Sequence, residues 1–221
     1  MFNAKCEKVP QIILCVVGNR MHFDVCKGEI MPRFSIIIPS YNNADLLKQC
    51  LESLISQTFE NWEAIVVVDA SPDNSFDLAM DYASADPRIK PINKRENEGQ
   101  HLARKTGMQY AQGEYSLLID ADDAICPTGL EELSKLADSH KKADMLHFGA
   151  KVLAANETPV KEADAFCSYM NREFDDLEGF DILAYPFDPR KGFTKDWMVT
   201  QRAYRTQLLK DAFDAMPYKR L

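Results

Sequence analysis

The sequence has no hydrophobic run long enough to cross a membrane and no excess of positive charge. Its longest early apolar run covers residues 12–17, whereas a membrane-spanning helix needs about 20 apolar residues. The 26 Lys and Arg residues against 34 Asp and Glu residues give a formal net charge of −8, which does not favour binding to nucleic acid or to an anionic membrane. The early run is also a poor signal-peptide core. We therefore expect an intracellular protein with no nucleic-acid partner, either cytoplasmic or peripheral at the inner membrane face.

The glycine and cysteine motifs that commonly bind nucleotides or metals are missing as well. None of the nine glycines forms the G-x-G-x-x-G of dinucleotide-binding folds or the G-x-x-x-x-G-K-[ST] of P-loop proteins. The six cysteines include no C-x-x-C pair, so neither a zinc knuckle nor a thioredoxin-like motif is expected. Cys50 falls on the apolar face of a predicted helix and is expected to be a small core residue. A bound nucleotide would have to be held by side chains and a metal.

The pattern that is present is a regular alternation of strands and helices from Phe34 onward. With 221 residues, 46% of them hydrophobic, the chain fits one large domain or one domain with appendages. Apolar runs predict strands at residues 34–39, 62–69, 89–93, 115–120 and 144–148, and helical spacing predicts helices between them at 46–55, 76–83, 100–111 and 129–139. This order predicts an α/β fold, a Rossmann-like and mainly parallel sheet flanked by helices.

The two ends of the chain do not follow this alternation. Residues 1–33 hold three of the six cysteines and form an N-terminal appendage, for which partial disorder is expected. This appendage either adds a strand through Ile12–Val17 or is an upstream extension of a domain that begins near Met31. Beyond residue 150 the periodicity weakens, and a helix is predicted again from Val199 to Phe213.

An acidic cluster follows the strand at residues 115–120. Asp120, Asp122 and Asp123 lie within four residues, and carboxylates this close repel one another unless a cation lies between them. A hard divalent cation prefers such oxygen ligands and often shares them with phosphate. Because ligands of open parallel sheets bind at the carboxyl ends of the strands, the segments 39–43 and 69–73 are expected to converge on this cluster.

Five motifs, in order between about residues 34 and 150, carry a resemblance to a known family. They are Ile37-Ile38-Pro39-Ser40-Tyr41-Asn42, Val68-Asp69 followed by Ser71 and Asp73, Asn97-Glu98-Gly99 with Ala103-Arg104 and Gly107, Gly113-Glu114-Tyr115, and Asp120-Ala121-Asp122-Asp123. Together they resemble family 2 glycosyltransferases, which have the GT-A fold of nucleotide-diphospho-sugar transferases. The resemblance makes 34–150 a nucleotide-sugar-binding core and 151–221 an acceptor-side segment.

The resemblance implies transfer of a sugar from a nucleotide diphosphate sugar to an acceptor hydroxyl, with inversion and with Mn or Mg on the diphosphate. The acceptor would be a saccharide or lipid-linked, in cell-surface polysaccharide or glycolipid assembly. The implied metal ligand is Asp122, and the implied donor-binding residues are Pro39, Tyr41, Asn42, Asp69, Arg104 and Asp120. In these roles Pro39 and Tyr41 line the base pocket. Asp69 contacts the base, Asp120 the ribose, and Arg104 the nucleotide's charge.

Two departures from the family pattern are visible. Ala70 stands where many members have a second aspartate, so base recognition is expected to differ. The Glu-Asp pair that carries the family's general base follows a helix like the one at residues 204–209, and no such pair occurs before Leu221. The catalytic base therefore stays unassigned, and we expect it beyond Leu221, in a truncated chain of uncertain activity. Asp196, Asp211 and Asp214 are substitutes with ordinary alternatives as caps or surface charges.

Structural alternatives exist for several of these residues. Asp69 suits a turn, Tyr41 and Asn42 suit a loop before a helix that Asn43 could cap, and Arg104 suits a solvated helix face. The acidic cluster is not needed as a helix cap, because residues 128–131 already form a capping box. Two functional alternatives stay open. One is a non-catalytic nucleotide-sugar-binding module, and the less favoured one is a D-x-D phosphotransferase, whose motif should follow the first strand.

Overall fold

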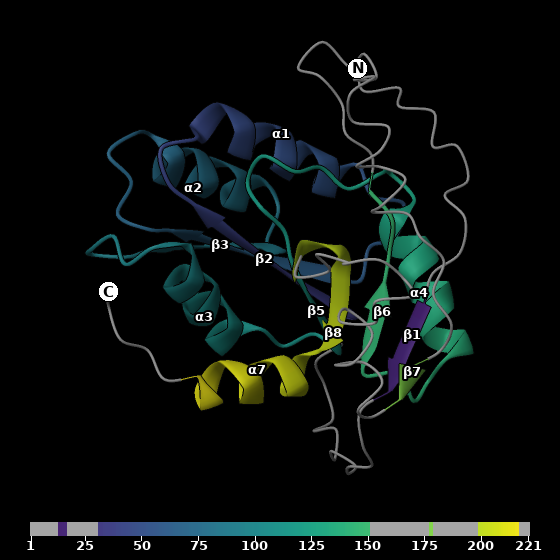
Figure 1. Cartoon of the computed structure of the whole chain (residues 1–221). Helices are drawn as coiled ribbons and strands as arrows, with labels where there is room; N and C mark the ends of the chain where they lie inside the picture. Colours follow the sequence, from purple (N-terminus) through teal and green to yellow (C-terminus); the bar gives the residue numbers. More distant parts are fainter. Residues whose placement is uncertain (1–12, 17–30, 151–176, 179–198, 217–221) are drawn as a thin grey trace, which may run out of the picture.

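The computed structural model of the 221-residue chain describes residues 13–16, 31–150, 177–178 and 199–216. Its strands form one sheet in the order β4-β3-β2-β5-β8-β6-β1-β7 (Figure 1). The strands are β1 Ile13–Val16, β2 Phe34–Ser40, β3 Trp62–Val68, β4 Ile89–Asn93, β5 Tyr115–Leu118, β6 Met145–His147, β7 Leu177–Glu178 and β8 Arg202–Arg205. The helices are α1 Ala44–Ile55, α2 Ser75–Ala85, α3 Gln100–Tyr110, α4 Gly129–Ser139, the 3-10 turn η3 Val199–Gln201 and α7 Thr206–Ala215.

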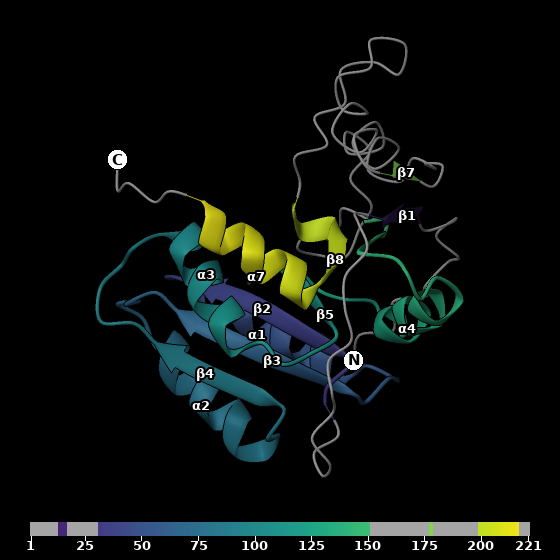
Figure 2. The ribbon, with the colours of Figure 1, turned by 90° about the horizontal axis from the view of Figure 1, so that it is seen from below.

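The parallel half of the sheet is built on β2, which pairs in parallel with both β3 and β5, while β4 pairs in parallel with β3. Every residue of β2 and β3 is buried, as expected for strands covered on both faces. The predicted α/β fold with a mainly parallel sheet between helices is confirmed. Figure 2 shows α3 and α7 on the opposite side of these strands from α2.

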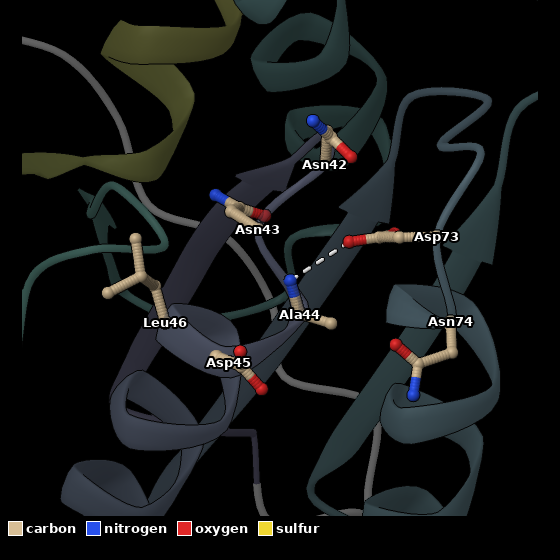
Figure 3. A pocket seen from close by; sticks show the side chains of 7 residues that line it. All are labelled: Asn42, Asn43, Ala44, Asp45, Leu46, Asp73 and Asn74. Carbon is tan, nitrogen blue, oxygen red and sulfur yellow. Dashed lines mark hydrogen bonds between the residues drawn. The ribbon is translucent and has the colours of Figure 1, made fainter.

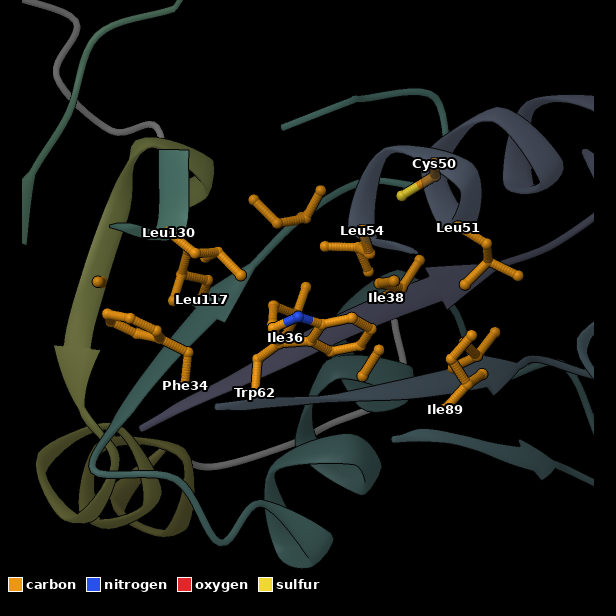
Figure 4. Close-up of a cluster of buried hydrophobic side chains, with 14 of the residues drawn as sticks. Phe34, Ile36, Ile38, Cys50, Leu51, Leu54, Trp62, Ile89, Leu117 and Leu130 are labelled. Atoms are coloured by element: carbon orange, nitrogen blue, oxygen red, sulfur yellow. The ribbon is translucent and has the colours of Figure 1, made fainter. Parts of the chain in front are cut away.

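Side chains of β2 alternate between two cores. Ile36 and Ile38 point to the larger core, where they meet apolar residues of α1 such as Leu51 and Leu54 and of α4 (Figure 4). Ile37 points to the other face and joins a cluster formed with α3 and with Phe213 of α7. This period-2 alternation is what a strand between two helix layers requires.

The predicted helix at Val199–Phe213 is wrong in its first half. Residues 199–201 form a 3-10 turn, and residues 202–205 form β8, an antiparallel strand inserted between β5 and β6. Ala203 is fully buried there, and the Arg205 guanidinium stacks over the Tyr115 ring and donates to Ala143 O at 3.0 Å. Residues 202–205 form a strand because they pair with both β5 and β6, although their spacing of apolar residues suits a helix. Such tertiary context often outweighs local preference in short segments.

Within the first 33 residues, the first of the two alternatives for this segment, a strand through Ile12–Val17, is present as β1. It pairs antiparallel with β6 and parallel with β7. Residues 1–12 and 17–30 lie outside the described part, so the three-part division of the chain stays a prediction. No described helix is long and apolar enough to span a membrane.

A buried carboxylate organises the amino end of the parallel strands. Glu63 of β3 is 2% exposed and accepts hydrogen bonds from Ser35 Oγ at 2.5 Å and Gln112 N at 2.7 Å. Lys90 Nζ lies 2.6 Å from its other oxygen. Ser35 Oγ in turn accepts from Gly113 N at 2.7 Å. All these contacts lie at the end of the sheet opposite to the acidic cluster, so they serve stability.

Candidate functional site

The loops that follow β2, β3 and β5 meet at the carboxyl end of these strands, as predicted from the sequence. Asp69 N donates to Ser40 O at 2.9 Å, and Asn42 N donates to Ser71 Oγ at 2.8 Å, which ties the first two loops together. The loop after β5 is attached beside them, where Ile119 N donates to Ile37 O at 3.1 Å. Residues distant in the chain are thereby brought to one edge of the sheet.

The acidic cluster forms a compact set of oxygen donors at this edge. Asp120, Asp122 and Asp123 each offer a carboxylate oxygen, and these atoms lie within 4.8 Å of one another. Partial burial and the neighbouring charges of Asp120 and Asp122 raise the pKa of Asp123. A negative cluster of this size, built only from carboxylates, fits a hard divalent cation such as Mg or Mn.

Two side chains of α3 hold the first aspartate of this cluster. Asp120 Oδ1 accepts hydrogen bonds from Arg104 Nη2 at 2.5 Å and from Gln100 Nε2 at 2.8 Å. The Arg104 side chain is 12% exposed, so it does not lie on a solvated helix face. Gln100 was not among the site residues predicted from the sequence. Gln100 lies four residues before Arg104, which puts both on the same side of a helix. This spacing could have predicted that Gln100 accompanies Arg104 at the site.

Cys50 of α1 lies directly under the cluster. It is 1% exposed, and its Sγ is 3.9 Å from Asp120 O. Burial, followed by the charges of the three aspartates, raises the pKa of its thiol to about 12. The residue is therefore a neutral thiol in the core, as the sequence predicted.

Asp69 has a different environment from the other predicted donor-binding residues. It is 2% exposed, its Oδ2 accepts from Gly99 N at 2.7 Å and from Glu98 N at 3.1 Å, and its Oδ1 lies 2.8 Å from Lys94 Nζ. These bonds fasten the loop that leads into α3, the helix that carries Gln100. The structure thus gives Asp69 a structural role, and its contact with a base stays a prediction.

A pocket of about 350 Å³ lies between the loops after β2 and β3, and among its lining residues the carboxylate of Asp73 points to Ala44 N (Figure 3). Asn43, named above as a possible cap of α1, is the N-cap residue but makes no side-chain cap bond. Its Oδ1 accepts from Ser40 Oγ at 2.7 Å. Asp73 Oδ2 instead accepts from Ala44 N at 3.0 Å, and its Oδ1 accepts from Ser75 N at 3.1 Å. One carboxylate therefore serves the first turns of two helices.

The remaining predicted base-pocket residues differ in exposure. Pro39 is buried within β2, whereas Tyr41 is 49% exposed at the edge. Asn42 and Ala70 both adopt left-handed backbone angles, with φ of 54° and 52°. This conformation is common for Asn but costs about 1 kcal/mol or more for Ala. The loop therefore keeps an unfavourable backbone at the position where Ala70 departs from the family pattern.

Comparison with known proteins identifies the family of this chain. The model of the family "Glycosyl transferase family 2" matches residues 35–197, which is most of the chain and includes every predicted site residue. The chain belongs to glycosyl transferase family 2. The expected family is confirmed.

Relatives among curated proteins support this membership. The chain is 40% identical over 105 residues to the uncharacterized glycosyltransferase YibD of Escherichia coli K12, covering 48% of this chain and 30% of YibD. It is 30% identical over 168 residues to glycosyltransferase GlyA of Streptococcus pneumoniae, covering 73% of this chain and 23% of GlyA. The chain thus spans about a third or less of these relatives.

Solved structures confirm the fold. The S. aureus TarS 1–349 crystal structure superposes with a TM-score of 0.58 at 24% identity, covering 84% of this chain and 50% of that one. At this identity the likeness concerns the fold alone, and it agrees with a GT-A arrangement of the family 2 core.

The predicted capping box of α4 is wrong in its bonding, although Thr128 is the N-cap residue. No side-chain cap bond is formed by Thr128, and Glu131 accepts instead from Thr58 Oγ1 at 2.8 Å and from Lys135 Nζ. The first turn of α4 is capped from outside, because Leu130 N donates to Gln57 Oε1 at 3.1 Å. The acidic cluster takes no part in this cap.

The substitutes named for a general base are exposed side chains of α7 with partners there or on α3, or they lie outside the described residues. Asp211 and Asp214 are on α7, where Asp211 accepts from Gln207 Nε2 at 2.7 Å and Asp214 lies 3.6 Å from Lys105 Nζ. Asp196 falls outside the described residues. The contacts of Asp211 and Asp214 are those of surface charges, and the general base stays unassigned.

Proposed function

We propose that the core of this chain binds a nucleotide diphosphate sugar at the carboxyl edge of its sheet. The whole protein would then transfer the sugar, with inversion, to a hydroxyl of a saccharide or lipid-linked acceptor. The observation that carries this proposal is the set of carboxylate oxygens of Asp120, Asp122 and Asp123 within 4.8 Å of one another, beside the Arg104 guanidinium. Membership of glycosyl transferase family 2 supports the reaction class.

The donor set suits a divalent metal held by Asp122 with Asp123. When bound, Mg or Mn supplies Lewis-acid stabilisation of charge on the departing diphosphate. Arg104 fixes Asp120 through its 2.5 Å hydrogen bond and keeps one positive charge at the same edge. Asp120 is then positioned for the ribose, and Arg104 for the phosphates.

The nucleobase of the donor would be held by the loops after β2 and β3. Tyr41 is half exposed at this edge and offers an aromatic face for stacking, while Pro39 and Asn42 shape the loop beneath it. Asp69 would act from its buried position through the loop at residues 94–99. Ala70 supplies no carboxylate, so we propose that recognition of the base depends more on stacking and on backbone groups than on a charged side chain.

Names of related proteins support the substrate class and the pathway. TarS of S. aureus, which shares the fold, has been solved in complex with UDP and with UDP-GlcNAc. The chain is 38% identical over 110 residues to the minor teichoic acid biosynthesis protein GgaB of Bacillus subtilis. We propose a role in assembling a cell-surface polysaccharide or glycolipid.

A nucleotide-sugar-binding module without turnover is the second candidate. It is favoured because neither Asp211 nor Asp214 on α7 is assigned as the general base. Whichever holds, donor binding should depend on metal.

Isothermal titration with UDP and GDP, each with and without Mn, tests both candidates together. Nucleotide binding that requires Mn is expected, and no metal-dependent binding of either nucleotide would overturn both. A sugar-release assay with UDP- and GDP-sugars then separates them, because only a transferase turns the donor over.

A further inference from the structure

The loop that carries the acidic cluster has few bonds of its own. Between β5 and α4, the described backbone bond inside the acidic segment is Asp123 N to Asp120 O at 3.0 Å. Three carboxylates gathered within 4.8 Å repel one another. Their arrangement must therefore be maintained from outside the loop.

The side chain of Gln57, just after α1, provides such a support. It is 7% exposed. Its Nε2 donates to Cys126 O at 2.7 Å, to Ile125 O at 3.2 Å and to Ser53 O at 3.0 Å. Its Oε1 accepts from Leu130 N at 3.1 Å. The NH2 group of this buried amide thus binds the loop at Ile125 and Cys126, and its oxygen binds the first turn of α4.

Two neighbours of Gln57 complete the attachment. Ser53 Oγ accepts from Ile125 N at 3.1 Å and donates to Cys50 O at 2.7 Å. Thr58 N donates to Pro127 O at 2.9 Å. The end of α1 therefore binds the loop at three consecutive residues, and the first of them comes two positions after Asp123.

The fit between this loop and α4 is close. A Cβ added at Gly129 would lie 2.7 Å from Ile125 Cγ2, a distance that requires atoms to move. A shift of the loop at Ile125 would therefore be resisted by α4 on one side and by Gln57 on the other. Residues 125–127 of the loop are therefore held in one position.

We propose that Gln57 is a positioning residue for the metal-binding loop. Its amide hydrogens hold the carbonyls of Ile125 and Cys126, and this fixes the direction in which Asp122 and Asp123 leave the strand. The inference deepens the proposed function and rests on it, because it concerns a cation at those carboxylates. Groups that orient metal ligands can change metal affinity without touching the ion, and Gln57 would do so through the backbone that follows Asp123.

Gln57→Glu is the sharpest test, because it keeps the size of the side chain but turns donors into acceptors facing three carbonyls. We expect Mn affinity, measured by isothermal titration and by the Mn EPR signal, to fall about tenfold. If Gln57→Glu does not fold, Ser53→Ala serves in its place. It removes the hydroxyl that accepts from Ile125 N and donates to Cys50 O, and it should give a smaller loss of Mn affinity. The matched control is Glu63→Gln, which disturbs the buried network at the opposite end of the sheet.

The control separates positioning from general loss of stability. Glu63→Gln should lower the melting temperature yet leave the Mn dissociation constant and EPR line shape of the folded protein unchanged. Unchanged Mn affinity in both Gln57→Glu and Ser53→Ala, or an equal loss in Glu63→Gln, would overturn the inference. Absence of Mn binding by the unaltered chain, with and without UDP or GDP, would instead overturn the metal part of the proposed function.

Discussion

Arg104 Nη2 lies 2.5 Å from Asp120 Oδ1, and this contact joins α3 to the loop after β5. Helix α3 is itself braced by α7. Lys105 Nζ donates to Phe213 O at 3.2 Å, and the rings of His101 and Phe213 lie 5.3 Å apart. A helix near the end of the described chain therefore supports a residue that contacts the candidate metal site.

Replacing Arg104 by Gln should change metal binding and nucleotide binding in opposite directions. Loss of a positive charge beside the acidic cluster leaves the carboxylates more negative, so Mn alone should bind several-fold more tightly. Binding of the Mn–nucleotide pair should weaken, because the charge beside the phosphates is gone. Without metal, stability should fall by about 2 kcal/mol.

Isothermal titration with Mn and then with Mn and UDP measures the two effects. The control is Lys48→Gln on the exposed side of α1, which also removes one positive charge. It should change neither Mn affinity nor nucleotide affinity. Unchanged nucleotide affinity in Arg104→Gln would restrict Arg104 to holding Asp120.

Asp122→Asn should abolish most metal-dependent nucleotide binding. The substitution keeps the shape of an exposed side chain and removes one ligand charge, and ligand charge sets the affinity for hard cations. Mn affinity should drop at least about tenfold, while the melting temperature without metal should rise slightly because a repulsive charge is lost. Asp81→Asn, an exposed change on α2, is the control. Equal Mn affinity in both variants would remove Asp122 from the site.

Asp73→Asn should destabilise the protein in a pH-dependent way. Partial burial disfavours the charged carboxylate, but hydrogen bonds from Ser71, Ser75 and Ala44 outweigh it and lower the pKa of Asp73 from 3.8 to about 2. A lowered pKa means that the stabilisation is present above the unfolded value and is lost as pH falls through the folded value. At neutral pH the variant should be about 1–2 kcal/mol less stable.

Urea unfolding at neutral pH, about pH 4 and about pH 3 measures this dependence, and the difference between the two proteins should shrink over the acidic part of the range. Asp77→Asn on the exposed side of α2 should show a small difference that does not follow this course. A gap between Asp73→Asn and the parent chain that stays constant down to about pH 3 would contradict the role of the charged carboxylate.

Two glycines should respond differently to Ala. At Gly113 an added Cβ would lie 2.6 Å from Ser35 N and 2.8 Å from Phe34 C, and backbone in the middle of a sheet cannot move aside. We expect a loss of about 3 kcal/mol. Gly99 has φ of 88° with nothing within 4 Å of its Cβ position, so only backbone strain of about 1–2 kcal/mol is expected. Thermal unfolding of both variants tests the order, and an equal loss would contradict it.

The parallel strands could be predicted from sequence because each is decided locally. Residues 36–38 and 64–68 are continuous apolar runs within strands that end at polar loops, and Leu47, Leu51 and Leu54 recur at helical spacing. Strand β8 could not be predicted in this way. Residues 202–205 are compatible with a helix, and only their pairing with β5 and β6 makes them a strand.

In the candidate site, too, one part could be predicted from the sequence and another could not. Asp120, Asp122 and Asp123 are neighbours in the chain, so repulsion between their charges and the need for a cation can be seen in the sequence itself. The partners of this cluster are distant. Gln57 is more than sixty residues away from the loop it holds, and no local pattern distinguishes its buried amide from an exposed one.

The sequence by itself determined the family, the parallel core and the acidic cluster, because these depend on short-range spacing and on the chemistry of adjacent residues. Only the tertiary structure decided that Arg104 and Gln100 bond Asp120, that Asp73 rather than Asn43 caps α1, and that α4 is capped by Gln57. The physical reason is that each of these hydrogen bonds needs two groups at about 3 Å, and folding alone brings such distant residues together.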